Sequence, residues 1–133
     1  MKPTLNNARD LLKKYNEKYI TNFELGKEYA LYPESDDEYG FKDCWPCNEQ
    51  AGVYLILDEN KEVIYVGQAK ILGIRFYYHF KPVDGKCVLR GQWRKKPKYI
   101  VALPAPDDAK YERLSLEEYL IQNLQPIDNT LGK

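Results

Sequence analysis

Two strand-forming segments separated by a short polar stretch constrain the fold of this chain more than any other feature. Residues 52–57 (GVYLIL) and 62–67 (EVIYVG) are rich in β-branched and aromatic side chains, whereas residues 58–61 (DENK) between them are polar. Segments of the first kind form strands, and a polar stretch of this length forms the turn between them. The sequence therefore predicts a β-hairpin.

The predicted hairpin brings two tyrosines together. With the turn centred on residues 58–61, Tyr54 is expected directly opposite Tyr65, and Gly52 opposite Gly67. The glycines leave the backbone beside the tyrosines open to close approach. Alternatively, the tyrosines only stack and the glycines only serve bulges. The tyrosine face would also pair Ile56 with Val63, and the opposite, aliphatic face would carry Val53, Leu55, Leu57, Ile64 and Val66.

The amino-terminal part is expected to contain a helix followed by a loop. Apolar residues recur at three- and four-residue steps over residues 4–20, and Thr4 can cap this helix. Residues 26–50 show no periodicity and contain several glycines and prolines among acidic residues. We expect a connecting loop there, with a short strand at Tyr29–Tyr32.

A second helix, expected near residues 70–80, carries two chemically useful side chains. Arg75 and His79 are four residues apart and therefore share one helical face. An arginine can bind a phosphate oxygen in bidentate fashion, and an imidazole one turn away can hydrogen-bond a phenol or a water. Alternatively, the pair is a surface arginine beside a histidine with a structural partner. A strand is expected next, near Tyr99–Leu103.

The last helix, expected to begin at residue 107 or 108 and to end near residue 124, places Glu117 on its apolar face. Glu118 points about 100° away. A carboxylate on an apolar face needs a cation or a metal ion beside it, because burying an unpaired charge is costly. The alternative is a salt bridge from Glu117 to Arg113 or Lys110. The apolar residues of this face are Ala109, Leu114, Leu116, Leu120, Ile121 and Leu124.

The charges are unevenly distributed, although the formal net charge is zero. Residues 81–98 contain seven Lys or Arg against Asp84, a net of +6, and residues 34–49 contain six acidic residues against Lys42, a net of −5. The zero net charge argues against a chain that coats nucleic acid by bulk electrostatics, but the basic segment can attract phosphate. The alternative is that both segments are solvated loops.

Three cysteines, an odd number, favour a reducing compartment over a disulfide framework. Cys44 and Cys47 form a CxxC pair, which is an alternative indication of a zinc or redox protein. One pair lacks the second pair of a closed zinc site, and Pro46 does not fit the helix start of a redox motif. The apolar segments have the length of strands, and none suits a signal peptide or a membrane span. We therefore expect a cytoplasmic protein with free thiols and no membrane partner.

Several motifs occur together in an order that resembles a known nuclease family. They are Gly52-Val53-Tyr54, Tyr65-Val66-Gly67, Arg75 with His79, and Glu117-Glu118-Tyr119-Leu120-Ile121 followed by Pro126-Ile127-Asp128-Asn129. Their joint order and spacing make residues 51–129 similar to the GIY-YIG nucleases. This resemblance implies an α+β fold with a small antiparallel β-sheet flanked by helices. The domain would occupy residues 51–133, and residues 1–50 would form an amino-terminal extension packed on it or preceding it.

The resemblance also implies an activity. Members of this family cleave DNA with one divalent metal ion, which predicts a DNA endonuclease that uses Mg²⁺ or Mn²⁺. Tyr54 would activate the attacking water, with Tyr65 and His79 tuning its phenol, because a free tyrosine with a pKa of about 10 is a poor base at neutral pH. The full set of implied catalytic residues is Tyr54, Tyr65, Arg75, His79, Glu117 and Asn129.

The remaining roles follow from the same resemblance. Arg75 would bind the scissile phosphate, Glu117 would hold the metal ion, and Asn129 would hydrogen-bond within the site and fix the end of the last helix. Gln68 is a departure, since several family members carry a lysine there. The alternative function is a non-catalytic nucleic-acid-binding module, which the complete set of catalytic residues disfavours. Outside the motifs, the residues expected to contact the DNA backbone near the active site are Arg90, Arg94, Lys95, Lys96 and Lys98.

Overall fold

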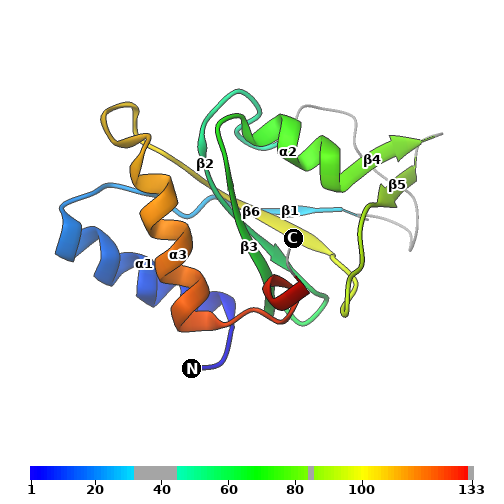
Figure 1. The fold of residues 1–133 in the computed structure, drawn as a ribbon, viewed down its shortest axis with the longest axis horizontal. Helices are drawn as coiled ribbons and strands as arrows, with labels where there is room; N and C mark the ends of the chain where they lie inside the picture. Colours follow the sequence, from blue (N-terminus) through cyan, green and yellow to red (C-terminus); the bar gives the residue numbers. More distant parts are fainter. Residues whose placement is uncertain (32–44, 84–85, 132–133) are drawn as a thin grey trace.

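The structure, a computed structural model, describes residues 1–31, 45–83 and 86–131. Figure 1 shows how helices and strands are arranged in this part of the chain. In chain order the elements are α1 (Leu5–Tyr19), β1 (Glu28–Ala30), β2 (Gly52–Leu57), β3 (Val63–Ala69), α2 (Leu72–His79), β4 (Phe80–Val83), β5 (Lys86–Leu89), β6 (Tyr99–Pro104), the 3₁₀-helix η1 (Asp107–Ala109), α3 (Glu112–Leu124) and the 3₁₀-helix η2 (Ile127–Leu131).

Four strands form one antiparallel sheet in the order β1-β6-β2-β3. The central strand β2 is buried along its whole length, which explains its continuous apolar sequence. β4 and β5 pair with each other in a separate hairpin beyond α2 (Figure 1). The sequence predicts only a basic loop at this hairpin, because Lys81, Pro82 and Lys86 weaken its strand pattern.

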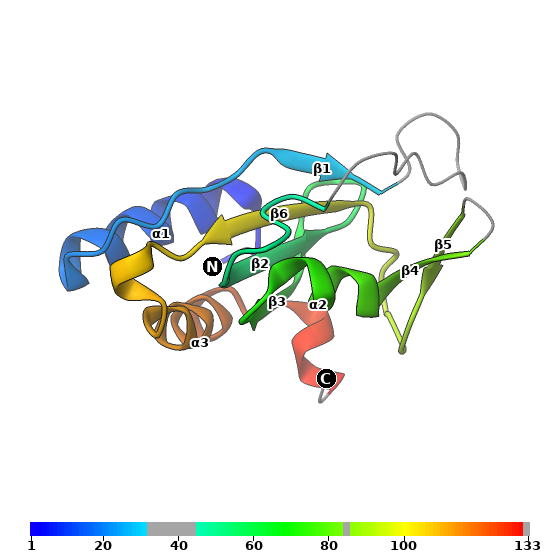
Figure 2. The same ribbon diagram turned by 90° about the horizontal axis from the view of Figure 1, so that it is seen from above.

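Helices cover both faces of the four-stranded sheet and create two hydrophobic cores. α1 and α3 pack together on one face, and α2 packs on the other (Figures 1 and 2). Successive residues of β2 point to opposite faces, so Val53 and Leu55 join the first core, whereas Tyr54 and Ile56 join the second. This architecture is the α+β fold, a small antiparallel sheet flanked by helices. Among the described residues, no helix has the length and apolar character needed to span a membrane.

The β2–β3 hairpin has a different register from the predicted one. Tyr54 pairs with Gly67 instead of Tyr65, and Gly52 pairs with Ala69 instead of Gly67. Because the offset is two residues and side chains alternate with a period of two, the tyrosines still share one face. They are diagonal neighbours, with ring centroids 6.1 Å apart. The predicted proximity of the tyrosines is therefore confirmed, whereas their direct pairing is wrong.

A bulge in β3 accounts for part of this offset. Ile56 pairs with Tyr65, but the next residue, Leu57, pairs with Val63, so Ile64 is an extra residue on β3. As a result, Ile64 packs with the tyrosine face and Val63 with the aliphatic face, opposite to the prediction. Strict alternation cannot reveal such a bulge.

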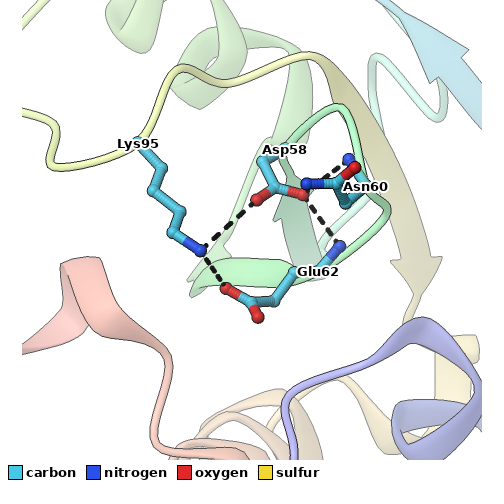
Figure 3. Close-up of polar contacts among 4 residues, drawn as sticks. All are labelled: Asp58, Asn60, Glu62 and Lys95. Carbon is cyan, nitrogen blue, oxygen red and sulfur yellow. Dashed lines mark hydrogen bonds and ion pairs between the residues drawn. The ribbon is translucent and has the colours of Figure 1, made fainter.

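The turn accounts for the rest of the offset. The backbone N–H of Asp58 donates to the carbonyl of Glu62 at 3.0 Å, so the turn is longer than predicted. Lys61 adopts a left-handed backbone with φ of 63°. The Asp58 carboxylate accepts the N–H groups of Asn60 and Glu62 at 2.9 and 3.0 Å (Figure 3). These side-chain bonds hold a turn that would otherwise favour glycine at the Lys61 position.

The last helix begins later than predicted and has a different phase. Asp107–Ala109 form a 3₁₀ turn, and α3 begins at Glu112. Leu114, predicted on the apolar face, is 48% exposed, whereas Arg113 is buried. The phase of the helix follows the four-residue spacing of its buried leucines, which places position 113 inside and position 114 outside. Those leucines are Leu116, Leu120 and Leu124.

The amino-terminal residues 1–31 pack on the domain. The predicted cap is confirmed, since the Thr4 hydroxyl accepts the backbone N–H of Asn7 at 3.1 Å. Tyr15 of α1 is fully buried and donates its hydroxyl to Glu112 of α3 at 2.9 Å. β1 adds the outer strand next to β6, one residue earlier than the predicted strand, whose last residue, Tyr32, lies outside the described residues.

Candidate active site

Two tyrosines and a histidine form a hydrogen-bonded chain between the sheet and α2. Tyr54 comes from β2, Tyr65 from β3, and His79 is the last residue of α2. The Tyr54 hydroxyl lies 2.8 Å from Nε2 of His79, and it also shares a hydrogen bond with the Tyr65 side chain. All three are buried, and the His79 ring centroid lies 5.8 Å from that of Tyr54 and 5.7 Å from that of Tyr65. The structure therefore brings these three predicted site residues together.

Gly67 makes room for the Tyr54 phenol. A Cβ placed on Gly67 would lie 2.4 Å from the Tyr54 hydroxyl oxygen, which is closer than real contacts allow. The group that approaches the open backbone is therefore Tyr54 itself. Gly52 has another function, since a Cβ there would meet the carbonyl oxygen of Leu103 on the neighbouring strand at 2.4 Å.

Aromatic rings enclose the hydrogen-bonded chain. Phe76 of α2 packs edge-on against Tyr54, with ring centroids 5.3 Å apart. Trp93 packs against Tyr65 at 5.7 Å and against His79 at 5.8 Å. Trp93 was not among the site residues predicted from the sequence, although an aromatic residue within a basic segment was a usable signal.

The environment disfavours ionisation of both phenols. Burial raises the pKa of Tyr54 far above its usual value, and the neighbouring Tyr65 and Glu117 add to this, while the charge of Arg75 opposes it. Burial also raises the pKa of Tyr65, as does Glu117, whereas Arg75 and the hydrogen bond with Tyr54 lower it. Both phenols are therefore neutral at neutral pH in the free protein.

Arg75 and Glu117 complete the site from two different helices. Arg75 on α2 is exposed, and Glu117 on α3 is half-buried. Burial raises the pKa of Glu117, Arg75 lowers it, and Glu118 raises it. Arg75 thus acts electrostatically on Glu117 and on both phenols. The ion pairs of the described residues do not include Glu117, so the alternative salt bridge to Arg113 or Lys110 is not formed.

Arg113 does not form the salt bridge with Glu117 that the sequence offered as an alternative, and it has other partners. Its Nε donates to Oε1 of Gln68 on β3 at 3.0 Å, and its Nη1 donates to the carbonyl of Lys110 at 2.8 Å. Only 6% of Arg113 is exposed. Sequence reasoning missed this link, which joins α3 to the strand that carries Tyr65.

Asn129 pairs with the backbone of the strand that carries Tyr65. Its Oδ1 accepts the N–H of Val66 at 2.8 Å, and its Nδ2 donates to the carbonyl of Val66 at 2.9 Å. β3 is an edge strand of the sheet, so Asn129 satisfies backbone groups that no further strand pairs. The contact holds η2, which follows α3, against β3 at Val66, the residue between Tyr65 and Gly67.

The five basic residues expected to contact DNA have different partners in the described part of the chain. Arg90 lies over the ring of Tyr78, 5.3 Å from its centroid, and is the nearest of the five in sequence to His79 of α2. Arg94 is exposed, and its backbone N–H donates to Asp128 of η2 at 2.8 Å.

The three lysines instead lie by the β2–β3 turn. Lys95 contacts the Glu62 carboxylate at 2.7 Å and that of Asp58 at 3.7 Å (Figure 3). Lys96 and Lys98 line the same hollow as Lys95 and residues 58–60. This turn lies at one end of the hairpin. The Gly52–Ala69 pair lies at the other end, where Gln68 is also located.

The cysteine alternative finds no support in the described part of the chain. Cys44 lies outside the described residues. Burial raises the pKa of the free Cys47 thiol, which opposes the thiolate that metal binding or redox chemistry needs. Among the described residues, no group of three or more His, Cys, Asp or Glu is arranged to hold a metal ion.

Comparison with known proteins identifies the region that contains this site. Residues 50–131 match the family described as the GIY-YIG catalytic domain. The chain is also similar to UvrABC system protein C from Rickettsia prowazekii (strain Madrid E), with 38% identity over 86 residues. The same protein from Microcystis aeruginosa (strain NIES-843 / IAM M-2473) is 33% identical over 87 residues, and that from Porphyromonas gingivalis (strain ATCC BAA-308 / W83) is 37% identical over 87 residues.

These alignments cover a small part of each relative. They include 64%, 63% and 64% of this chain, but only 13%, 13% and 14% of the respective relatives. The catalytic-domain match contains all six predicted catalytic residues and the five basic residues, whereas α1 and β1 precede it.

Proposed function

This chain belongs to the GIY-YIG family, and from that premise we propose that it is a metal-dependent endonuclease that hydrolyses phosphodiester bonds in DNA. The family match and the similarity to UvrABC system protein C support a nuclease-type function for the matched region. The observation that carries the proposal is the 2.8 Å contact between the Tyr54 hydroxyl and His79, next to the charges of Arg75 and Glu117.

In this proposal, the hydrogen-bonded chain removes a proton from the attacking water. Tyr54 donates its own proton to Nε2 of His79 while its oxygen accepts one from the water, so no free phenolate is required. The water oxygen forms a new bond to phosphorus as the bond to the 3′ oxygen breaks. Tyr65 can pass the water proton into the same chain. Tyr54 takes part by either route, because it links Tyr65 to His79.

Arg75 is proposed to bind the scissile phosphate. Its exposed guanidinium can donate two hydrogen bonds to phosphate oxygens, and its charge opposes the negative charge that develops during the reaction. The same charge lowers the pKa of Tyr54, which helps the phenol release its proton.

Glu117 is proposed to hold Mg²⁺ or Mn²⁺. It is half-buried and has no ion-pair partner among the described residues. Mg²⁺ commonly keeps several waters and takes one or two carboxylates together with substrate phosphates, so one glutamate beside a bound phosphate fits this ion. When bound, the metal ion would stabilise negative charge on the phosphoryl group and on the departing oxygen. Glu118 is exposed and is not part of this proposal.

The test is an incubation of the purified protein with supercoiled and branched DNA, with Mg²⁺ and with a chelator. We expect cleavage only with the metal ion, and none by a Glu117→Gln variant. Cleavage that persists in chelator would contradict the role of the metal ion. DNA binding without cleavage under all conditions would assign the chain to the non-catalytic alternative. The proposal includes a cytoplasmic location, where a free thiol such as that of Cys47 stays reduced.

A further inference from the structure

Arg113 is a buried cation with two hydrogen-bond partners among the described residues. Its Nε and Nη1 atoms donate to Gln68 and to the carbonyl of Lys110. An arginine carries five N–H donors, so these two contacts leave most of them unused. Among the described residues, no carboxylate forms an ion pair with Arg113. A buried charge without an ionic partner is costly unless an anion from outside binds it.

Arg113 lines two hollows, one of which also contains Glu49 and Asp107; the other, toward Arg75, has the charge that such an anion requires. Its volume is about 330 Å³, and Arg75 lines it together with Arg113, Lys70 and Gln68. The other described residues of its lining are apolar, so the hollow has three cations and no carboxylate. A phosphate is the anion that suits a planar guanidinium fork.

The hollow also lies next to the proposed site of cleavage. Arg75, proposed to bind the scissile phosphate, forms one wall of it. Arg113 precedes Glu117 by four residues on α3, which places it about one helical turn away, or roughly 6 Å along the axis. A DNA strand whose scissile phosphate binds Arg75, beside the metal ion that Glu117 would hold, would therefore continue into the hollow.

We propose that Arg113, held by Gln68, binds a backbone phosphate that flanks the scissile phosphate. This inference rests on the proposed nuclease function and adds a second phosphate site to it. Gln68 fixes the direction of the guanidinium, because its amide oxygen accepts Nε–H without neutralising the charge. Arg113 supplies from α3 the positive charge that position 68 itself lacks.

The chemistry of position 68 provides a sharp test. Gln68→Glu has nearly the same shape, but it places a carboxylate against the Arg113 guanidinium and neutralises it. Gln122→Glu is the matched control, because it adds the same charge at an exposed position of α3, the helix that carries Arg113. Arg113→Met removes the cation and keeps most of the side-chain volume. If Arg113→Met does not fold, Gln68→Glu still tests the proposal.

The measurement is the dissociation constant for a short DNA duplex at several salt concentrations, in chelator, so that no cleavage occurs. For Gln68→Glu and Arg113→Met we expect weaker binding and a slope of log K against log salt that is smaller by about 0.9, the effect of removing one bound phosphate. Gln122→Glu should keep the slope of the unchanged protein. Gln68→Glu with the affinity and slope of this control would overturn the proposal.

Separate measurements distinguish this inference from the proposed function. If the unchanged protein cleaves DNA but its binding does not depend on Gln68→Glu or Arg113→Met, only the flanking site is wrong. If it binds DNA through Arg113 but never cleaves, the nuclease proposal is wrong and the phosphate site stands. Absence of both cleavage and binding would overturn both.

Discussion

The phenol of Tyr54 occupies the space beside Gly67 that any other side chain at position 67 would fill. The two residues are cross-strand partners on β2 and β3, and the absence of a Cβ lets the hydroxyl reach His79. The glycine of the Tyr65-Val66-Gly67 motif is thus required sterically by the tyrosine of the Gly52-Val53-Tyr54 motif.

Gly67→Ala should therefore destabilise the protein. The added methyl group would lie 2.4 Å from the Tyr54 hydroxyl, and overpacking of this kind costs about 1 to 3 kcal/mol. The free energy of unfolding, measured by urea denaturation, checks this. In a Tyr54→Leu background the same substitution should cost clearly less, because the clashing ring is absent. Equal costs in both backgrounds would show that the clash is not with Tyr54.

Glu117→Gln should abolish cleavage and leave DNA binding nearly intact, because it removes a metal ligand without changing the size of the side chain. The matched control is Glu118→Gln, which changes an exposed neighbour and should matter far less. Single-turnover cleavage and DNA affinity would be measured for both variants. The reverse pattern would mean that Glu118 holds the metal ion.

The raised pKa of Glu117 predicts a pH dependence of stability. Burial shifts it upward from 4.5, so the folded protein binds this proton more tightly than the unfolded chain. The free energy of unfolding should then fall as pH rises from about 4 through the folded-state pKa, and stay lower above it. In the absence of a divalent metal ion, Glu117→Gln should remove this loss and gain stability relative to the unchanged protein as the pH rises above the pKa of the unfolded carboxyl. A stability difference that does not vary with pH would contradict the shift.

The basic residues should divide into two groups in DNA binding. Replacing all five by alanine should weaken binding and reduce the salt slope by about 0.9 for each phosphate that is no longer bound. The single substitution Lys95→Ala should weaken DNA binding least, because Glu62 and Asp58 already contact the Lys95 charge. Arg90 and Arg94 should contribute more, because both are exposed and neither forms an ion pair within the described residues. An unchanged slope in the fivefold variant would assign the segment to a solvated loop.

The proximity of Tyr54 and Tyr65 could be predicted because it depends on local periodicity, whereas His79 was expected beside Tyr54 only from the family resemblance. Strand alternation places the tyrosines on one face even when the register is displaced by two residues. The displacement itself depends on the Asp58 carboxylate and on the bulge at Ile64, which alternation does not encode.

The contacts of Arg113 and Trp93 could not be predicted in the same way. Arg113 and Gln68 are 45 residues apart, and their hydrogen bond depends on how α3 crosses the edge of the sheet. The position of Trp93 depends on the path of the chain after β5, which places its ring against Tyr65 and His79. Tertiary packing of this kind has no periodic signal in a single sequence.

The single-turnover cleavage rate of Tyr54→Phe tests the central claim most directly. Tyr54→Phe keeps the ring but removes the hydroxyl that contacts His79, and Tyr19→Phe, at an exposed position on α1, is the matched control. We predict that Tyr54→Phe slows the chemical step by on the order of 10² to 10⁴, with DNA affinity unchanged, that Tyr65→Phe slows it less, and that Tyr19→Phe leaves it unchanged. Cleavage by Tyr54→Phe at the rate of the unchanged protein would exclude the phenol from the proton path and move the role of base to His79 or to a metal-bound water.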